Sequence, residues 1–184
     1  MWRVDGPFFE DAWFALVPTQ PAVDFCAYVK TLRMDDVLWD ILGMSSNSDE
    51  RMSLRATGAF TAGGYSTVDR ETVRLESPDE AALPGLAASV ADRALSATEA
   101  FLGSIGFDED ELYRRILEQG VGLTGCIASI CLGDLRGAMG IAKGYREKFP
   151  DKYDGFSFRI GERSDVELVI DWCERRLAGR GEGA

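Results

Sequence analysis

Two pairs of side chains in this sequence have the types and spacing that catalysis could use. Glu10 and Asp11 are adjacent carboxylates among aromatic residues, a pairing that can serve acid–base chemistry. Cys26 precedes Lys30 by four residues, and a nearby cation can favour the thiolate that a cysteine nucleophile needs. The sequence has no histidine, which is the commonest general base and metal ligand. Most hydrolase and metalloenzyme mechanisms are therefore excluded.

The four cysteines do not form a recognisable metal or redox motif. No two of the cysteines are spaced as Cys-x-x-Cys, and each lies in an apolar stretch: Cys26, Cys126, Cys131 and Cys173. This pattern predicts buried free thiols in a reducing cytosol. The acidic run from Asp108 to Glu111 is too compact for a calcium loop and is better placed at a helix N-terminus. We expect no catalytic residue, no metal and no cofactor.

The charge balance restricts the class of partner. The chain carries 31 acidic and 20 basic residues, a formal net charge of -11. Such a surface repels nucleic-acid backbones and anionic membranes, so we expect neither as a partner and favour a basic protein. The charge also has a simpler interpretation, which is solubility. The first residues lack the apolar core of a signal peptide, and no uncharged run is long enough to span a membrane, so we expect a cytoplasmic protein.

Hydrophobic periodicity predicts an α+β fold that is predominantly helical, with about six helices and a small antiparallel sheet of three to five strands. The longest buried helix is expected to open near Ser77 and to run mainly from Pro84 to Gly106. The other helices are expected at residues 22–33, 35–42, 108–119, 121–132, 135–149 and 164–178, and strands at 12–17, 51–76 and 156–160. Residues 1–178 should form a single domain, followed by a disordered tail at 179–184.

The N-terminal segment is rich in aromatic residues. Trp2, Phe8, Phe9 and Trp13 fall within thirteen residues. They either pack in the core, as large apolar rings usually do, or form a patch that binds a partner protein. These four residues are one candidate partner-binding site.

A second candidate site is a row of glycines. Gly133, Gly137, Gly140 and Gly144 recur at helical spacing, apart from the apolar face that the same segment presents. Each interior glycine destabilises a helix by about 1 kcal/mol relative to alanine, which suggests that another backbone approaches closely. The alternatives are packing within the chain, a homodimer contact or a ligand contact through Gly137, Gly140 and Gly144.

The helix pair around these glycines carries a local resemblance. Leu132-Gly133-Asp134, Ala138 and Pro150 resemble the second half of a tetratricopeptide repeat, a helix hairpin used in protein binding. The match covers about thirty residues, and no copy lies one repeat length to either side, so we interpret the pair as a generic helix hairpin. The order of helix, three strands, helix, later strand and final helix also resembles that of small acidic secretion chaperones.

These observations favour a non-enzymatic, cytosolic protein-binding module of the chaperone, immunity or adaptor type. The alternative is a small-molecule-binding protein or an enzyme that uses the carboxylates or Cys26, and a third possibility is a structural homodimer.

Overall fold

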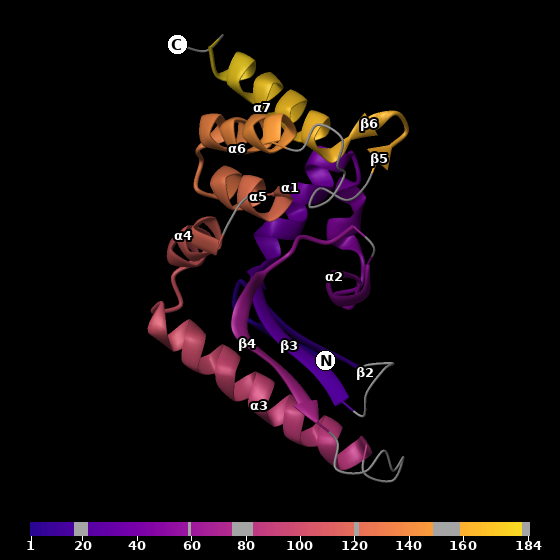
Figure 1. The fold of residues 1–184 in the computed structure, drawn as a ribbon. Helices are drawn as coiled ribbons and strands as arrows, with labels where there is room; N and C mark the ends of the chain where they lie inside the picture. Colours follow the sequence, from indigo (N-terminus) through magenta and orange to yellow (C-terminus); the bar gives the residue numbers. More distant parts are fainter. Residues whose placement is uncertain (17–21, 59, 75–82, 120–121, 149–158, 182–184) are drawn as a thin grey trace. The chain divides into compact units, whose positions relative to one another are not determined.

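A computed structural model describes residues 1–16, 22–58, 60–74, 83–119, 122–148 and 159–181 (Figure 1). The chain forms two compact units. The first, here called the sheet unit, comprises Met1–Thr31 and Gly64–Glu109. The second, the helical unit, comprises Leu32–Gly63 and Asp110–Ala184. Each unit is described separately below.

The sheet unit contains a four-stranded antiparallel sheet in the order β1-β2-β3-β4. Its strands are β1 (Trp2–Asp5), β2 (Phe8–Leu16), β3 (Ala22–Thr31) and β4 (Tyr65–Arg74). Asp5 pairs with Phe8, so a two-residue turn joins β1 and β2, and Gly6 supplies its positive φ of 56°. β1 is an edge strand.

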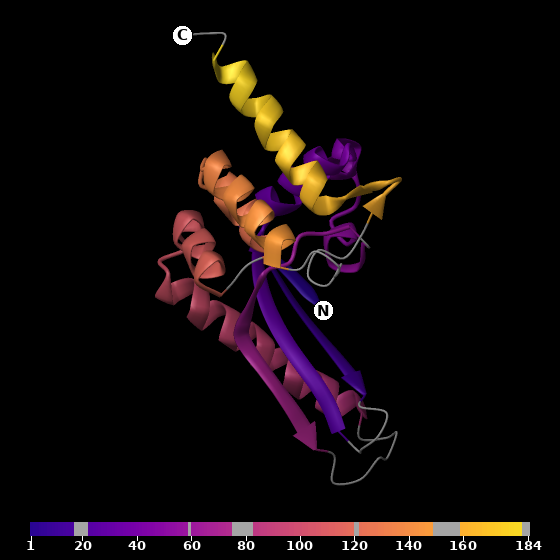
Figure 2. The same cartoon turned by 45° about the horizontal axis from the view of Figure 1, so that its top comes forward.

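One face of this sheet is covered by α3 (Leu83–Ser104), which runs alongside the strands in both views (Figures 1 and 2). The buried contact joins Ala12, Phe25 and Ala27 of the sheet to Val90 and Ala94 of the helix. Alanine and valine on α3 leave room for the sheet to approach closely. The predicted main helix from Pro84 is confirmed; residues 77–82 lie outside the described residues.

The helical unit is built mainly from α1 (Leu32–Leu42), α5 (Leu123–Cys131), α6 (Leu135–Lys148) and α7 (Asp165–Gly181). It also contains α4 (Glu109–Gln119), the short α2 (Leu54–Thr57), a 3-10 turn at Ser45–Asp49 and a hairpin of β5 (Arg159–Ile160) and β6 (Arg163–Ser164). α5 and α6 pack together as the predicted helix hairpin, with Gly133 at a φ of 83° between them. α7 packs against α6 and α1.

The α+β class and the small antiparallel sheet are therefore confirmed. The start of α7 also follows its predicted capping box. Ser164 N donates to a Glu167 carboxylate oxygen at 2.8 Å, and Glu167 N donates to Ser164 Oγ at 3.3 Å. α7 continues through Gly179 to Gly181, into the segment predicted as a tail. None of the described helices combines the length and apolar character needed to cross a membrane.

The predicted helix at residues 22–33 is wrong, because Ala22–Thr31 forms β3. β3 is an inner strand, paired with β2 on one side and β4 on the other, and eight of its ten residues are buried. A strand buried on both faces shows no alternation of apolar and polar residues. Its apolar run therefore also satisfied helical spacing, and periodicity alone could not separate the two structures.

The predicted three-strand meander at residues 51–76 is also wrong. Among the described residues of this segment only β4 is a strand, and the expected turn at Asp69 to Glu71 lies inside it. Arg55, expected on the polar side of a strand, is instead buried in α2, where it donates to the Leu32 carbonyl at 2.7 Å. Arg55 and its partner Leu32 are far apart in the sequence. Local β-propensity does not report contacts between such distant residues. In the predicted strand 156–160, residues 156–158 lie outside the described residues.

Candidate functional site

The sheet brings three of the four predicted aromatic site residues to one face. Phe9 and Trp13 lie four positions apart on β2 and therefore point to the same side. Trp2 pairs with Asp11, and Val4 pairs with Phe9, so these β1 side chains share that side. This is the face opposite α3, and we call Trp2, Val4, Phe9 and Trp13 the tryptophan face. Phe8 points to the other side.

The two tryptophans of this face are accessible to solvent. Trp2 is 42% exposed, Trp13 is 46% exposed and Val4 is 36% exposed. Phe9 is fully buried, and the Trp2 ring stacks on it with ring centroids 5.7 Å apart. Trp2 and Trp13 are diagonal neighbours across β1 and β2, a separation of about 7–8 Å between backbones. Phe8 is buried against Phe107 at 6.2 Å between ring centroids, so it belongs to the core.

A carboxylate lies between the tryptophans. Asp11 is opposite Trp2 and two residues before Trp13, on the same face. It accepts a 2.8 Å hydrogen bond from Tyr28 Oη, and the Met1 amine lies 3.6 Å away. The sheet unit as a whole carries thirteen acidic and five basic residues, a formal charge of about −8, compared with eighteen and fifteen in the helical unit. The acidity of the protein is therefore concentrated in the unit that holds the tryptophan face.

The candidate carboxylate pair is split by the sheet. Glu10 and Asp11 are adjacent on β2 and point to opposite faces. Glu10 is buried, where it accepts from Arg3 Nε at 3.0 Å and Nη2 at 2.8 Å and from the Thr98 hydroxyl. Both carboxylates are held by neighbours on their own side. They cannot act together on one substrate.

The candidate thiol pair is separated for a related reason. In a helix Cys26 and Lys30 would be one turn apart, but in β3 they are about 13 Å apart along the strand at 3.3 Å per residue. The Lys30 ammonium lies 5.2 Å from the centre of the Phe9 ring instead. Cys26 is buried and contacts the Ala27 carbonyl at 3.9 Å. Because the segment is a strand, Lys30 is too far from Cys26 to favour its thiolate.

All four cysteines are buried and form no disulfide, as predicted. Burial raises the pKa of Cys126 to about 12, with smaller contributions from Cys173 and Asp165. Burial also raises the pKa of Cys173 to about 11, with Glu174 adding to it. Both thiols are therefore protonated at neutral pH, and neither is a nucleophile in the folded protein.

We expect iodoacetamide at pH 8 to label Cys126 and Cys173 slowly in the native protein. A pKa near 12 leaves a thiolate fraction about a thousandfold below that of an ordinary cysteine, and burial blocks access as well. Mass spectrometry of timed samples, with protein unfolded in guanidinium chloride as the fast control, gives the rates. Rapid labelling of Cys126 or Cys173 in the native protein would contradict this, and rapid, selective labelling of Cys26 would revive the thiol-enzyme alternative.

The candidate glycines do not form one site. Asp134 Oδ1 accepts from Gly137 N at 2.8 Å, and the Asp134 carboxylate occupies the space where a Gly137 side chain would lie. At Gly140 and Gly144 an added Cβ would meet no described atom within 4 Å. Packing against the residues that the structure describes therefore does not account for Gly140 and Gly144. A homodimer contact through them stays a prediction.

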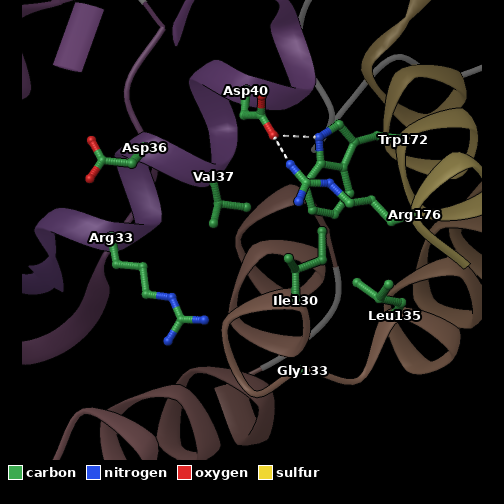
Figure 3. Close-up of a pocket in the computed structure, with 9 residues that line it drawn as sticks. All are labelled: Arg33, Asp36, Val37, Asp40, Ile130, Gly133, Leu135, Trp172 and Arg176. Atoms are coloured by element: carbon green, nitrogen blue, oxygen red, sulfur yellow. Dashed lines mark hydrogen bonds and ion pairs between the residues drawn. The ribbon is translucent and has the colours of Figure 1, made fainter. Parts of the chain in front are cut away.

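A polar cluster in the helical unit was missed at the level of sequence (Figure 3). Trp172 Nε1 donates to Asp40 Oδ2 at 2.9 Å, and Arg176 Nη2 donates to the same oxygen at 2.6 Å. The Arg176 guanidinium lies 4.5 Å from the centre of the Trp172 rings. Partial burial raises the pKa of Asp40, but the bonds from Trp172 and Arg176 outweigh it and hold the pKa below its usual value. Asp40 is therefore ionised at neutral pH.

The cluster borders a hollow of about 300 Å³ whose apolar wall includes Val37, Ile130 and Leu135. The spacing of Trp172 and Arg176 by four residues in a helix was the only local signal of the cluster. Asp40 lies 132 residues before Trp172, and only the packing of α1 against α7 brings them together.

Comparison with known proteins does not place the chain in a family: no family model, no curated protein and no solved structure matches it.

Proposed function

We propose that this chain is a non-enzymatic protein-binding module, of the chaperone, immunity or adaptor type, whose tryptophan face receives a basic segment of another polypeptide. The observation that carries the proposal is the exposure of Trp2 and Trp13 on one sheet face, with the Asp11 carboxylate between them. Tryptophan is among the residues most often found to dominate the energy of protein interfaces.

The chemistry of this face favours a basic partner. An arginine or lysine side chain is attracted to the face of an indole ring, and tryptophan is the strongest of the aromatic residues in this interaction. Asp11 lies beside the rings but is buried and close to the Met1 amine, so the attraction of a basic protein rests mainly on the formal charge of about −8 on the sheet unit. The enzyme alternative has less support, because its carboxylate pair and its thiol pair are both separated by the sheet geometry.

We expect the double substitution Trp2→Ala and Trp13→Ala to weaken partner binding by about 30-fold or more, since loss of a central interface tryptophan typically removes at least 2 kcal/mol. The measurement is affinity capture from cells of the native host with wild-type and variant baits, quantified by mass spectrometry. A basic protein should be recovered in stoichiometric amount with the wild type alone, and its recovery should fall when sodium chloride is raised.

The matched control is the double substitution Met52→Ala and Ile160→Ala, which removes two other side chains that are each 36% exposed. This variant should recover the partner as the wild type does. Circular dichroism would verify the fold of both variants, because Trp2 also stacks on Phe9. Equal recovery of the same proteins by the wild type and the tryptophan variant, or recovery of an acidic partner, would contradict the proposal.

A further inference from the structure

The helical unit holds two hollows that are both lined by Trp172. The first, of about 300 Å³, has Val37, Ile130, Leu135 and Trp172 as apolar lining. The second, of about 420 Å³, has Ile41, Leu42 and Leu168 as apolar lining and is also lined by Arg163 and Arg175. Both share Asp40, Trp172 and Arg176. The first has the more apolar lining, contributed by α1, α5, α6 and α7.

The carboxylates at the first hollow are already neutralised. Asp36 accepts from Arg55 Nη2 at 2.8 Å, and Asp40 accepts from Arg176 at 2.6 Å. The guanidinium of Arg33, by contrast, makes no hydrogen bond or ion pair with the part of the chain that the structure describes, and it points away from Asp36 (Figure 3). The lining of the hollow carries two arginines and two aspartates, and Arg33, which is exposed, supplies a cation that no described carboxylate neutralises.

Arg176 is fixed in place but retains donors. Its Nη2 is bonded to Asp40, and its guanidinium is stacked on Trp172 at 4.5 Å. Since a guanidinium has five N–H donors in a planar fork, most of those donors stay available to a ligand. Arg33 and Arg176 thus present cationic donors around an apolar wall formed by Val37, Ile130 and Leu135.

We propose that this hollow binds a small organic carboxylate with an apolar or aromatic body. The fork of a guanidinium matches a carboxylate, and the apolar wall would cover the rest of the molecule. A volume of about 300 Å³ is at the lower end for ligand sites, so it fits a molecule of one ring and not a nucleotide. This inference does not depend on the tryptophan face, which belongs to the other unit.

The test is a titration of the full chain with phenylacetate, followed by the NMR signals of the arginine Nε–H and tryptophan Nε1–H groups. We expect saturable shifts at Arg33 and Trp172, with a Kd below about 10 mM for a ligand of this size. Arg33→Gln should weaken binding at least about tenfold, and Arg33→Glu should abolish it. The matched control Arg136→Gln, an exposed arginine of α6 outside the hollow, should bind as the wild type does.

Two further ligands test the chemistry that the proposal assigns. Phenylacetamide, which lacks the charge, should bind at least about tenfold more weakly. Inorganic phosphate, which lacks the apolar body, should also bind more weakly. The proposal is overturned if phenylacetate gives no saturable shift, if Arg33→Gln binds as tightly as the wild type, or if either of these ligands matches phenylacetate. Unchanged thermal melting of the variants would show that they remain folded.

Discussion

Replacing Asp35 with alanine is expected to destabilise the helical unit by about 3 kcal/mol, because it removes the fully buried carboxylate that accepts from both Arg55 and the Ala62 amide. Asp35 is fully buried in α1. Its Oδ1 accepts from Ala62 N at 2.7 Å, and its Oδ2 lies 3.3 Å from Arg55 Nη1. Arg55 is 8% exposed and is stacked on Trp39 at 4.8 Å from the ring centre. One carboxylate therefore connects α1 to both α2 and the segment that follows it.

Urea unfolding followed by far-UV circular dichroism measures this loss, and hydrogen exchange of the α1 amides localises it. The matched control is Asp36→Ala. Asp36 accepts from the same guanidinium at 2.8 Å but is 46% exposed, so water replaces it and the expected loss is below about 1 kcal/mol. Equal losses for the two variants would show that burial does not set the strength of these contacts.

Replacing Glu10 with alanine is expected to destabilise the sheet unit by about 2–3 kcal/mol. Glu10 is 2% exposed and forms a bidentate pair with Arg3, which ties the edge strand β1 to β2. It also accepts from the Thr98 hydroxyl, which ties β2 to α3. The effect should be smaller than that of Asp35→Ala, because Arg3 is 32% exposed and water can partly solvate its charge after the substitution.

Near-UV circular dichroism should report this change as well, since release of β1 frees Trp2 from its stacking on Phe9. The matched control is Glu99→Ala. Glu99 bonds the same arginine at 2.6 Å but is 60% exposed, so its removal should change the free energy of unfolding by less than about 1 kcal/mol. A larger effect for Glu99→Ala than for Glu10→Ala would contradict the assignment of Glu10 as the anchor of β1.

The sequence predicted the helices whose signals are local. α4 and α6 have strong 3.6-residue periodicity, and their buried residues, such as Leu112, Ile116, Ala138 and Ala142, are those expected from that period. The Ser164 and Glu167 capping box that starts α7 was found in the same way. Such features depend on residues within about four positions of each other, so no knowledge of the rest of the chain is required.

The prediction failed where partners are distant in sequence. The sequence predicts a helix at β3 because the apolar run fits both structures, and only its pairing with β2 and β4 selects the strand. That single error also placed Lys30 beside Cys26, so the error in the fold produced an error in the candidate site. The buried Arg55 was missed for the same reason, since its partners Leu32 and Asp35 lie at least twenty residues away.

The sequence by itself determined the α+β class, the excess of acidic residues and the absence of histidine. It also identified the aromatic residues of the N-terminal segment. Tertiary structure alone decided which of those residues are accessible. Antiparallel pairing placed Trp2 and Trp13 on one face and Phe8 on the other, and the packing of α1 against α7 brought Asp40 to Trp172 and Arg176. Composition and local spacing do not encode these relations, because each depends on contacts between segments that are free to pair in many ways until the whole chain has folded.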